Sequence, residues 1–247
     1  MAHEQISVRT QDGDCPVHVL TPSSGTQWPA AIFYMDAGGI RPALVAMAQR
    51  LADAGYLVLL PDLFYRFGPY APLVPVEVFK GDFRAIIGPM MATTDNGKAA
   101  DDTRALLAYL DTRSDVVGKA IGVTGFCMGG GMALTAAGRY PDRVAAAASF
   151  HGGRLATDAP DSPHLQSTTI KAEVYVAGAD NDDSYPPEMA ERLEQALVAG
   201  LVRHRCEIYD GALHGWVMTD FPVYAEAAAE RAWQELLALF ARNLPQE

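Results

Sequence analysis

Hydrophobic residues along the chain form two kinds of pattern, short continuous runs and longer stripes with a spacing of three or four. Short apolar runs between turn residues are typical of buried strands, whereas the stripes indicate amphipathic helices. The runs lie at residues 29–35, 56–60, 120–124, 144–150, 172–177 and 204–209, and the stripes at 43–55, 96–112, 132–139, 186–199 and 222–244. Their alternation predicts an α/β fold with a mainly parallel central sheet and helices on both faces.

Two stretches depart from this alternation. Residues 6–9 and 17–20 flank Asp12-Gly13-Asp14, which predicts an antiparallel hairpin at the start of the chain. Residues 67–95 are rich in proline and glycine with scattered aromatic residues, and they are too long for an ordinary connection. We therefore expect one domain over residues 1–247, with 67–95 as a lid-like excursion over the mouth of the site.

The predicted strand 120–124 and helix 132–139 enclose Gly125-Phe126-Cys127-Met128-Gly129. Strand, Gly-x-Cys-x-Gly, helix is the arrangement of a nucleophile elbow, with sulfur in place of the usual serine oxygen. The flanking glycines avoid collisions in a tight turn, and the N–H of Met128 at the helix N-terminus can stabilise an oxyanion. The alternative is that Cys127 is an inert buried thiol, as most free cysteines are.

Polar residues follow the other predicted strands. Asp36 and Ala37 come directly after strand 29–35, so the N–H of Ala37 is a candidate second oxyanion donor, and Asp36 lies either in the site or in a structural turn. An acidic cluster follows strand 172–177, and His214 follows the last strand. Nucleophile, acid, histidine is the chain order of the α/β-hydrolase triad. Asp182 is the expected acid, with Asp180 as the alternative.

Four further residues are candidates for contact with substrate or thiol. Arg66 and Arg84 are cations in or beside the 67–95 excursion, where a guanidinium could hold a carboxylate. His151 follows strand 144–150 and has either a structural or a substrate-contact role, and Trp216 lies two residues after His214.

The bulk composition narrows the class of protein. The net charge of −11 over 247 residues argues against a nucleic-acid partner or an anionic membrane surface. No run of 18 or more apolar residues occurs, and the first residues lack the pattern of a signal peptide, so we expect a cytoplasmic location. Cys15, Cys127 and Cys206 form no disulfide framework and no zinc-ligand spacing, so no metal is expected, and Cys15 and Cys206 are interpreted as core residues.

Gly-Phe-Cys-Met-Gly-Gly at 125–130, Leu-His-Gly at 213–215 and the acidic loop together make the chain resemble the dienelactone hydrolase family over nearly its whole length. The resemblance implies that Cys127, Asp182 and His214 open lactones or cleave small esters without metal or cofactor. It also implies an acidic residue that contacts the resting thiol, here Asp36. The arginine with which the family holds a substrate carboxylate falls at Met218, which favours a less charged ester or lactone.

We therefore expect a cysteine-dependent hydrolase of small esters or lactones, monomeric or a small homo-oligomer, acting through a Cys-His-Asp triad and an acyl-enzyme. Two alternatives remain open. The same triad could cleave another bond, such as a thioester or a carbon–carbon bond. A degenerate hydrolase fold could instead serve as a ligand-binding or redox-sensing module.

Overall fold

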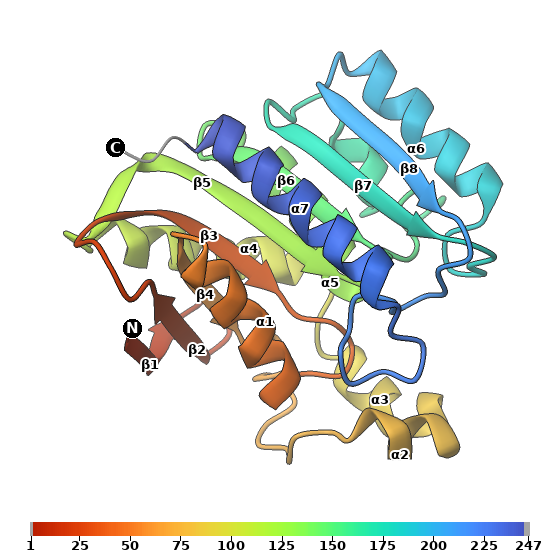
Figure 1. The fold of residues 1–247 in the computed structure, drawn as a ribbon, viewed down its shortest axis with the longest axis horizontal. Coiled ribbons are helices and arrows are strands. Elements are labelled where there is room, and N and C mark those ends of the chain that lie inside the picture. Colours follow the sequence, from red (N-terminus) through yellow and green to blue (C-terminus); the bar gives the residue numbers. More distant parts are fainter. Residues whose placement is uncertain (1, 245–247) are drawn as a thin grey trace.

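The computed structural model describes residues 2–244 of the chain. Its centre is an eight-stranded sheet in the order β1-β2-β4-β3-β5-β6-β7-β8 (Figure 1). The first two neighbouring pairs, β1–β2 and β2–β4, are antiparallel, and the others are parallel, which confirms the mainly parallel sheet. The strands are β1 (Ala2–Arg9), β2 (Asp14–Thr21), β3 (Trp28–Tyr34), β4 (Leu57–Pro61), β5 (Val116–Phe126), β6 (Val144–Phe150), β7 (Glu173–Ala179) and β8 (His204–Tyr209).

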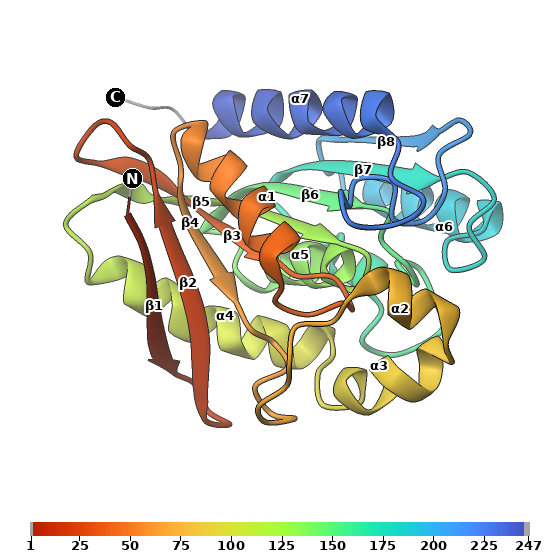
Figure 2. The same cartoon turned by 60° about the horizontal axis from the view of Figure 1, so that its bottom comes forward.

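Helices cover both faces of this sheet, as expected from the alternating pattern. Helices α1 and α7 pack on one face, and α4, α5 and α6 pack on the other (Figure 2). Helices α2 and α3 lie beyond the ends of the strands instead (Figure 2). The bounds are α1 (Pro42–Asp53), α2 (Pro75–Lys80), α3 (Phe83–Met91), α4 (Asn96–Asp111), α5 (Met128–Arg139), a 3-10 turn (Pro163–Gln166), α6 (Pro187–Ala199) and α7 (Glu226–Asn243).

The hydrophobic core follows the central strands. Phe33, Phe126 and Phe150 come from β3, β5 and β6 and stack in a row, with ring centroids 4.8 Å and 5.3 Å apart. Each of the three is at most 1% exposed. This row of rings lies at the carboxyl ends of its strands and supports the loops that follow them. No helix within residues 2–244 combines the length and the hydropathy needed to cross a lipid bilayer.

The structure differs from the sequence expectation at four helices. Helix α5 begins at Met128 rather than 132. Its first turn contains Gly129, Gly130 and Gly131, which are poor helix formers, but close packing leaves no room for a side chain at these positions. Helix α7 begins at Glu226 rather than 222, because the N–H of Ala225 bonds to the carbonyl of Trp216 in the preceding loop. The 67–95 excursion holds α2 and α3, which its proline and glycine content concealed.

Candidate active site

Cys127 lies on a sharp turn between β5 and α5. Its φ of 53° and ψ of −116° place a non-glycine residue in a conformation that costs about 1–3 kcal/mol. Close packing on both sides forces this turn. A β-carbon on Gly129 would lie 2.5 Å from the carbonyl oxygen of Tyr34, and one on Gly125 would lie 1.9 Å from that of Gly129. Side chains at these two positions would therefore collide with the backbone, as the Gly-x-Cys-x-Gly pattern predicts, so the turn requires glycine there.

The structure brings the three predicted triad residues together. Nδ1 of His214 lies 2.7 Å from Oδ2 of Asp182. Burial opposes protonation of His214, but its hydrogen bond to Asp182 and its interaction with the Cys127 thiol outweigh this and raise the pKa of the imidazole to about 10. The raised pKa means that the imidazole holds a proton strongly, which favours the state in which His214 rather than the neighbouring sulfur carries the proton.

Asp182, rather than Asp180, is the acid that reaches the histidine. The Asp182 side chain is 4% exposed, and burial opposes its charge, but hydrogen bonds from His214 and Ser184 lower the pKa of the carboxyl. Asp180 instead accepts the backbone N–H of Gly211 at 3.2 Å. Asp180, the alternative acid that the sequence left open, therefore does not bond to the imidazole of His214.

Ser184 holds the acid in place and was not singled out from the sequence. Its hydroxyl donates to Oδ1 of Asp182 at 2.6 Å, and its backbone N–H donates to the same oxygen at 2.8 Å. Oδ2 is left for His214. A serine two residues after an aspartate is a common turn pattern, so the sequence contained a signal, but one that occurs in many loops.

His151 lies beneath the triad rather than in the cavity. It is 0% exposed, and its Nδ1 accepts the backbone N–H of Cys127 at 3.1 Å. Burial, and then the nearby His214, hold the pKa of His151 well below its ordinary value. The ring is therefore neutral and carries its proton on Nε2. Its centroid is 5.1 Å from those of both His214 and Trp216, so it fills the space behind the imidazole of His214.

Two cavities open at the thiol. The larger, of about 680 Å³, is lined by Cys127, His214 and Asp182 together with Met128 and Ala37. The smaller, of about 190 Å³, also reaches Cys127 and His214, and its walls are mainly apolar side chains of the 67–95 excursion and the loop before α7: Leu73, Pro75, Val78, Phe79, Phe83, Ile87 and Phe221. Met128 is the first residue of α5, so its N–H has no acceptor within the helix.

Asp36 lines the smaller cavity, but its carboxylate is paired with Arg41, which does not line that cavity. Nη1 and Nη2 of Arg41 donate to the two oxygens of Asp36 at 2.6 Å and 2.9 Å, and Nε of Arg41 donates to Asp220 at 2.6 Å. Burial opposes the charge of Arg41, but these bonds raise the pKa of its guanidinium further above its ordinary value. Asp36 is therefore part of a buried ion-pair network, which the sequence did not reveal because Asp220 lies far along the chain.

Three other predicted residues are not brought to either cavity. Arg66 pairs with Asp12 and with the buried Asp102, on the side of the molecule formed by the β1–β2 hairpin. Arg84 is exposed on α3, where its neighbour Phe83 faces the cavities instead. Trp216 is 0% exposed and stacks on Tyr209, with centroids 5.1 Å apart, so it supports the site from the core.

Comparison with known proteins agrees with this geometry. Residues 16–244 match the model of the dienelactone hydrolase family. A carboxymethylenebutenolidase of Rhodococcus opacus is 28% identical over 247 residues, which cover 98% of this chain and 93% of that protein. A candidate carboxymethylenebutenolidase of Synechocystis is 26% identical, covering 97% of this chain and 96% of that one.

A solved structure shares the fold. The crystal structure of a candidate dienelactone hydrolase from Klebsiella pneumoniae superposes with a TM-score of 0.85 at 23% identity, covering 98% of each chain. The family model spans nearly the whole chain, and the elbow, the acidic loop and the histidine turn all fall within the matched residues. The chain therefore belongs to the dienelactone hydrolase family, and it is a hydrolase with an α/β fold.

Proposed function

We propose that the protein is a cysteine-dependent hydrolase of small, uncharged esters or lactones. The observation that carries the proposal is the continuous chain of contacts from the carboxylate of Asp182, through the imidazole of His214, to the thiol of Cys127. A thiol, a base and an orienting carboxylate on one cavity wall are the parts that nucleophilic acyl transfer requires.

In the proposed reaction, the proton of the Cys127 thiol passes to His214, and the thiolate attacks the acyl carbon. The N–H groups of Met128 and Ala37 donate to the oxyanion that forms. His214 then gives its proton to the leaving oxygen, the carbon–oxygen bond breaks, and a thioester remains. Water attacks the thioester while His214 takes its proton, and the released thiolate is protonated as the acid leaves.

The walls of the two cavities support an uncharged acyl group. Met218, at the position where the resemblance places the family's substrate arginine, is fully buried and lines neither cavity, so that position offers a substrate no cation. The charge of Arg41 is already shared between Asp36 and Asp220. Asp95, Asp161 and Asp183 line the larger cavity, and Arg154 is the one arginine or lysine among its described lining residues. We place the acyl group in the smaller cavity, under the 67–95 lid.

Replacement of the nucleophile tests this proposal. Cys127→Ala should lower the turnover of p-nitrophenyl acetate and of a small lactone by at least about 10³-fold. Cys15→Ala is the matched control, because Cys15 is fully buried away from both cavities and should leave turnover within a few-fold. Intact mass spectrometry of the parent protein with the ester should show one added acetyl group that is absent from Cys127→Ala.

The substrate class can be tested in the same assay. An ester whose acyl chain ends in a carboxylate should react at least about 10-fold more slowly than the uncharged ester of equal length, because no unpaired cation lines the smaller cavity within residues 2–244. Unchanged turnover in Cys127→Ala would reject the cysteine mechanism. Iodoacetamide labelling of Cys127 without any hydrolysis would instead favour a ligand-binding or redox-sensing protein.

A further inference from the structure

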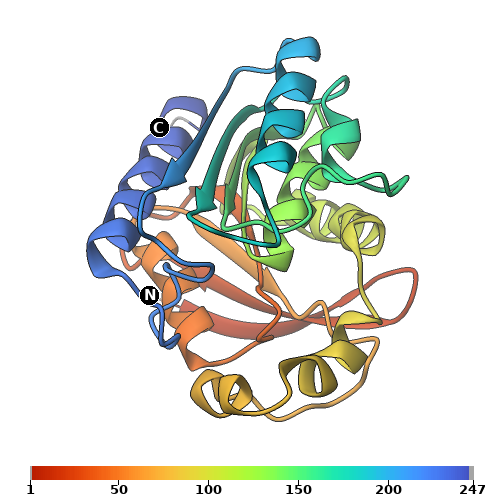
Figure 3. The ribbon, with the colours of Figure 1, turned by 90° about the vertical axis from the view of Figure 1, so that its right-hand side faces the viewer.

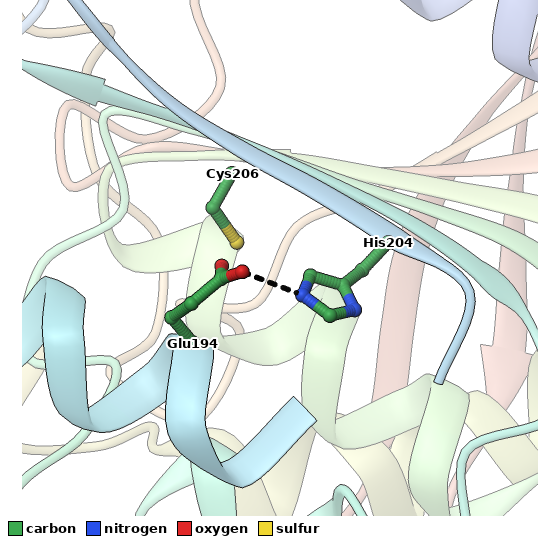
Figure 4. A group of neighbouring side chains, drawn as sticks. All are labelled: Glu194, His204 and Cys206. Carbon is green, nitrogen blue, oxygen red and sulfur yellow. Dashed lines mark hydrogen bonds and ion pairs between the residues drawn. The ribbon is translucent and has the colours of Figure 1, made fainter. Parts of the chain in front are cut away.

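Three side chains with metal-binding atoms meet where α6 packs beside the edge strand β8 (Figures 3 and 4). Glu194 comes from α6, and His204 and Cys206 come from β8, where alternate residues share one face. Their ligand atoms all lie within 4.8 Å of one another, and Nε2 of His204 is 3.0 Å from Oε1 of Glu194. This cluster is at the amino end of β8, whereas His214 follows its carboxyl end.

The imidazole of His204 is oriented as a ligand would be. Its Nδ1 lies 2.7 Å from the carbonyl oxygen of Val202, and because a carbonyl can only accept, Nδ1 carries a proton. The other nitrogen, Nε2, therefore faces Glu194 and is the one available for coordination. Metal-ligating histidines are commonly held in this way, with the far ring nitrogen donating to a backbone carbonyl.

A second observation points to a missing group beside the cluster. The phenol of Tyr185 is buried in a residue that is 3% exposed, and its oxygen has no hydrogen-bond partner among the described residues. Its ring and the side chain of Ile208 both lie against Gly178 of β7, and Ile208 shares one face of β8 with Cys206. A buried O–H without an acceptor is costly, and an additional acceptor at the cluster would remove that cost.

We propose that Glu194, His204 and Cys206 form a zinc site, with a water molecule as the fourth ligand. One thiolate, one imidazole and one carboxylate match the ligands of four-coordinate Zn²⁺, and the thiolate disfavours Mg²⁺ and Ca²⁺. Coordination replaces the thiol proton of Cys206 and any proton on Nε2 of His204, and both pass to the buffer. The Glu194 side chain is 48% exposed, so the ion can enter from solvent.

The site would join a helix to an otherwise unprotected edge of the sheet. Strand β8 pairs only with β7 within the described sheet, and α6 is connected to it by a short link containing Gly200 and Leu201. A metal ion bound to residues of both α6 and β8 would cross-link the helix to the edge strand. We expect its effect on folding stability rather than on the chemistry at Cys127.

The experiment uses the full chain carrying Cys127→Ala, so that the triad thiol cannot bind the metal. After removal of metal with a chelator, titration with Zn²⁺ against a chromophoric chelator should give one ion per chain, and the Tm should rise with zinc concentration. Titration with Co²⁺ should give a thiolate-to-cobalt charge-transfer band. Cys206→Ser in this background should weaken binding by more than about 100-fold and abolish the band, and Tyr185→Phe should weaken binding about 10-fold.

Cys15→Ser in the same background is the matched control and should keep the stoichiometry and the band, since Cys15 lies on β2, far along the sheet order from β8. If Cys206→Ser does not fold, His204→Gln replaces it with the same expected loss. Absence of zinc binding by the folded Cys127→Ala protein would reduce the cluster to an ion pair and overturn the proposal. Zinc binding of unchanged affinity in the folded ligand variant, Cys206→Ser or its replacement His204→Gln, would place the metal elsewhere and also overturn the proposal.

Discussion

The molecule contains two clusters built from the same three chemical groups, a cysteine, a histidine and a carboxylate. In one, Cys127 is held in a left-handed turn at the start of α5 and faces two cavities. In the other, Cys206 lies in regular strand geometry, opposite Val176 of β7. What separates them is the backbone. Of the two sulfurs, that of Cys127 lines a cavity and is followed by a helix N–H without an acceptor in the helix, which supports the proposed acyl transfer at Cys127 rather than at Cys206.

The histidines of the two clusters also differ in the backbone element that holds them and in their hydrogen-bond partners. His214 lies on a turn between a carboxylate and a thiol, with 30% of its side chain exposed at the cavity. Both ring nitrogens of His204 are hydrogen-bonded, one to the carbonyl of Val202 and the other to Glu194. This fixed orientation suits a metal ligand better than a residue that transfers protons. Identical residue types therefore predict a function only when the element that presents them is known.

The largest expected effect comes from removing the charge of the triad acid. Asp182→Asn should lower kcat by about 10³- to 10⁴-fold, because the imidazole loses the carboxylate that fixes its tautomer and stabilises its protonated form. Asp180→Asn is the control and should stay within about 3-fold, because Asp180 bonds to the N–H of Gly211 instead. Steady-state kinetics with p-nitrophenyl acetate give both values. A larger loss in Asp180→Asn would reverse the assignment of the acid.

The next effect concerns the backbone of the elbow. Gly129→Ala should reduce the free energy of unfolding by about 3 kcal/mol or more, because its β-carbon would lie 2.5–2.6 Å from two carbonyl oxygens of β3 and the loop after it. Gly88→Ala in α3 is the matched control. Nothing lies within 4 Å of a β-carbon there, so a gain of up to about 1 kcal/mol is expected. Equal urea midpoints for the two variants would show that the elbow does not depend on close packing.

The pH dependence of stability should reveal the protonation of His214, the proposed base. The folded pKa of His214, about 10, is above the unfolded value near 6.5, so the contribution of its protonation is complete below pH 6.5 and is lost as pH rises through 10. Between pH 6 and pH 10 the parent should lose on the order of a few kcal/mol more than His214→Gln. Urea denaturation at both pH values measures this. Parallel losses in the two proteins would show that His214 is not stabilised in its protonated form.

The smallest effect is expected at the residue that positions the acid. Ser184→Ala should lower kcat by about 10-fold with little change in KM, because Asp182 loses the hydroxyl bond but keeps the backbone N–H of residue 184. Ser184→Thr retains a hydroxyl and should recover part of the rate. A change confined to KM would assign Ser184 to substrate binding instead.

Much of the fold was predictable because local patterns and tertiary packing agree. All six buried runs became strands, and the glycines around Cys127 identified the elbow from the chain alone. The order of nucleophile, acid and histidine was equally accessible, since each residue follows its own strand. Helices α2 and α3 were missed because Pro75 and Pro89 sit in or at the start of them, where proline usually argues against a helix.

The parts of the site that the sequence concealed depend on residues far apart along the chain. Arg41 joins Asp36 to Asp220, and nothing in the local sequence links those positions. The sequence leaves Arg66 available to hold a substrate, but the structure pairs its guanidinium with the buried carboxylate of Asp102. The cluster of Glu194, His204 and Cys206 escaped notice for the opposite reason. Its spacing is short, but it matches none of the common zinc patterns, and only the packing of α6 against β8 reveals it.

The strained turn at residue 127 sets stability and reactivity against each other. Cysteine carries a β-carbon in a region of φ and ψ that suits glycine, so replacing it with glycine would relax the turn while deleting the proposed nucleophile. A library screened only for heat resistance would therefore drift toward inactive members at this codon. Engineers seeking a tougher catalyst should hold position 127 fixed and gain robustness elsewhere in the chain.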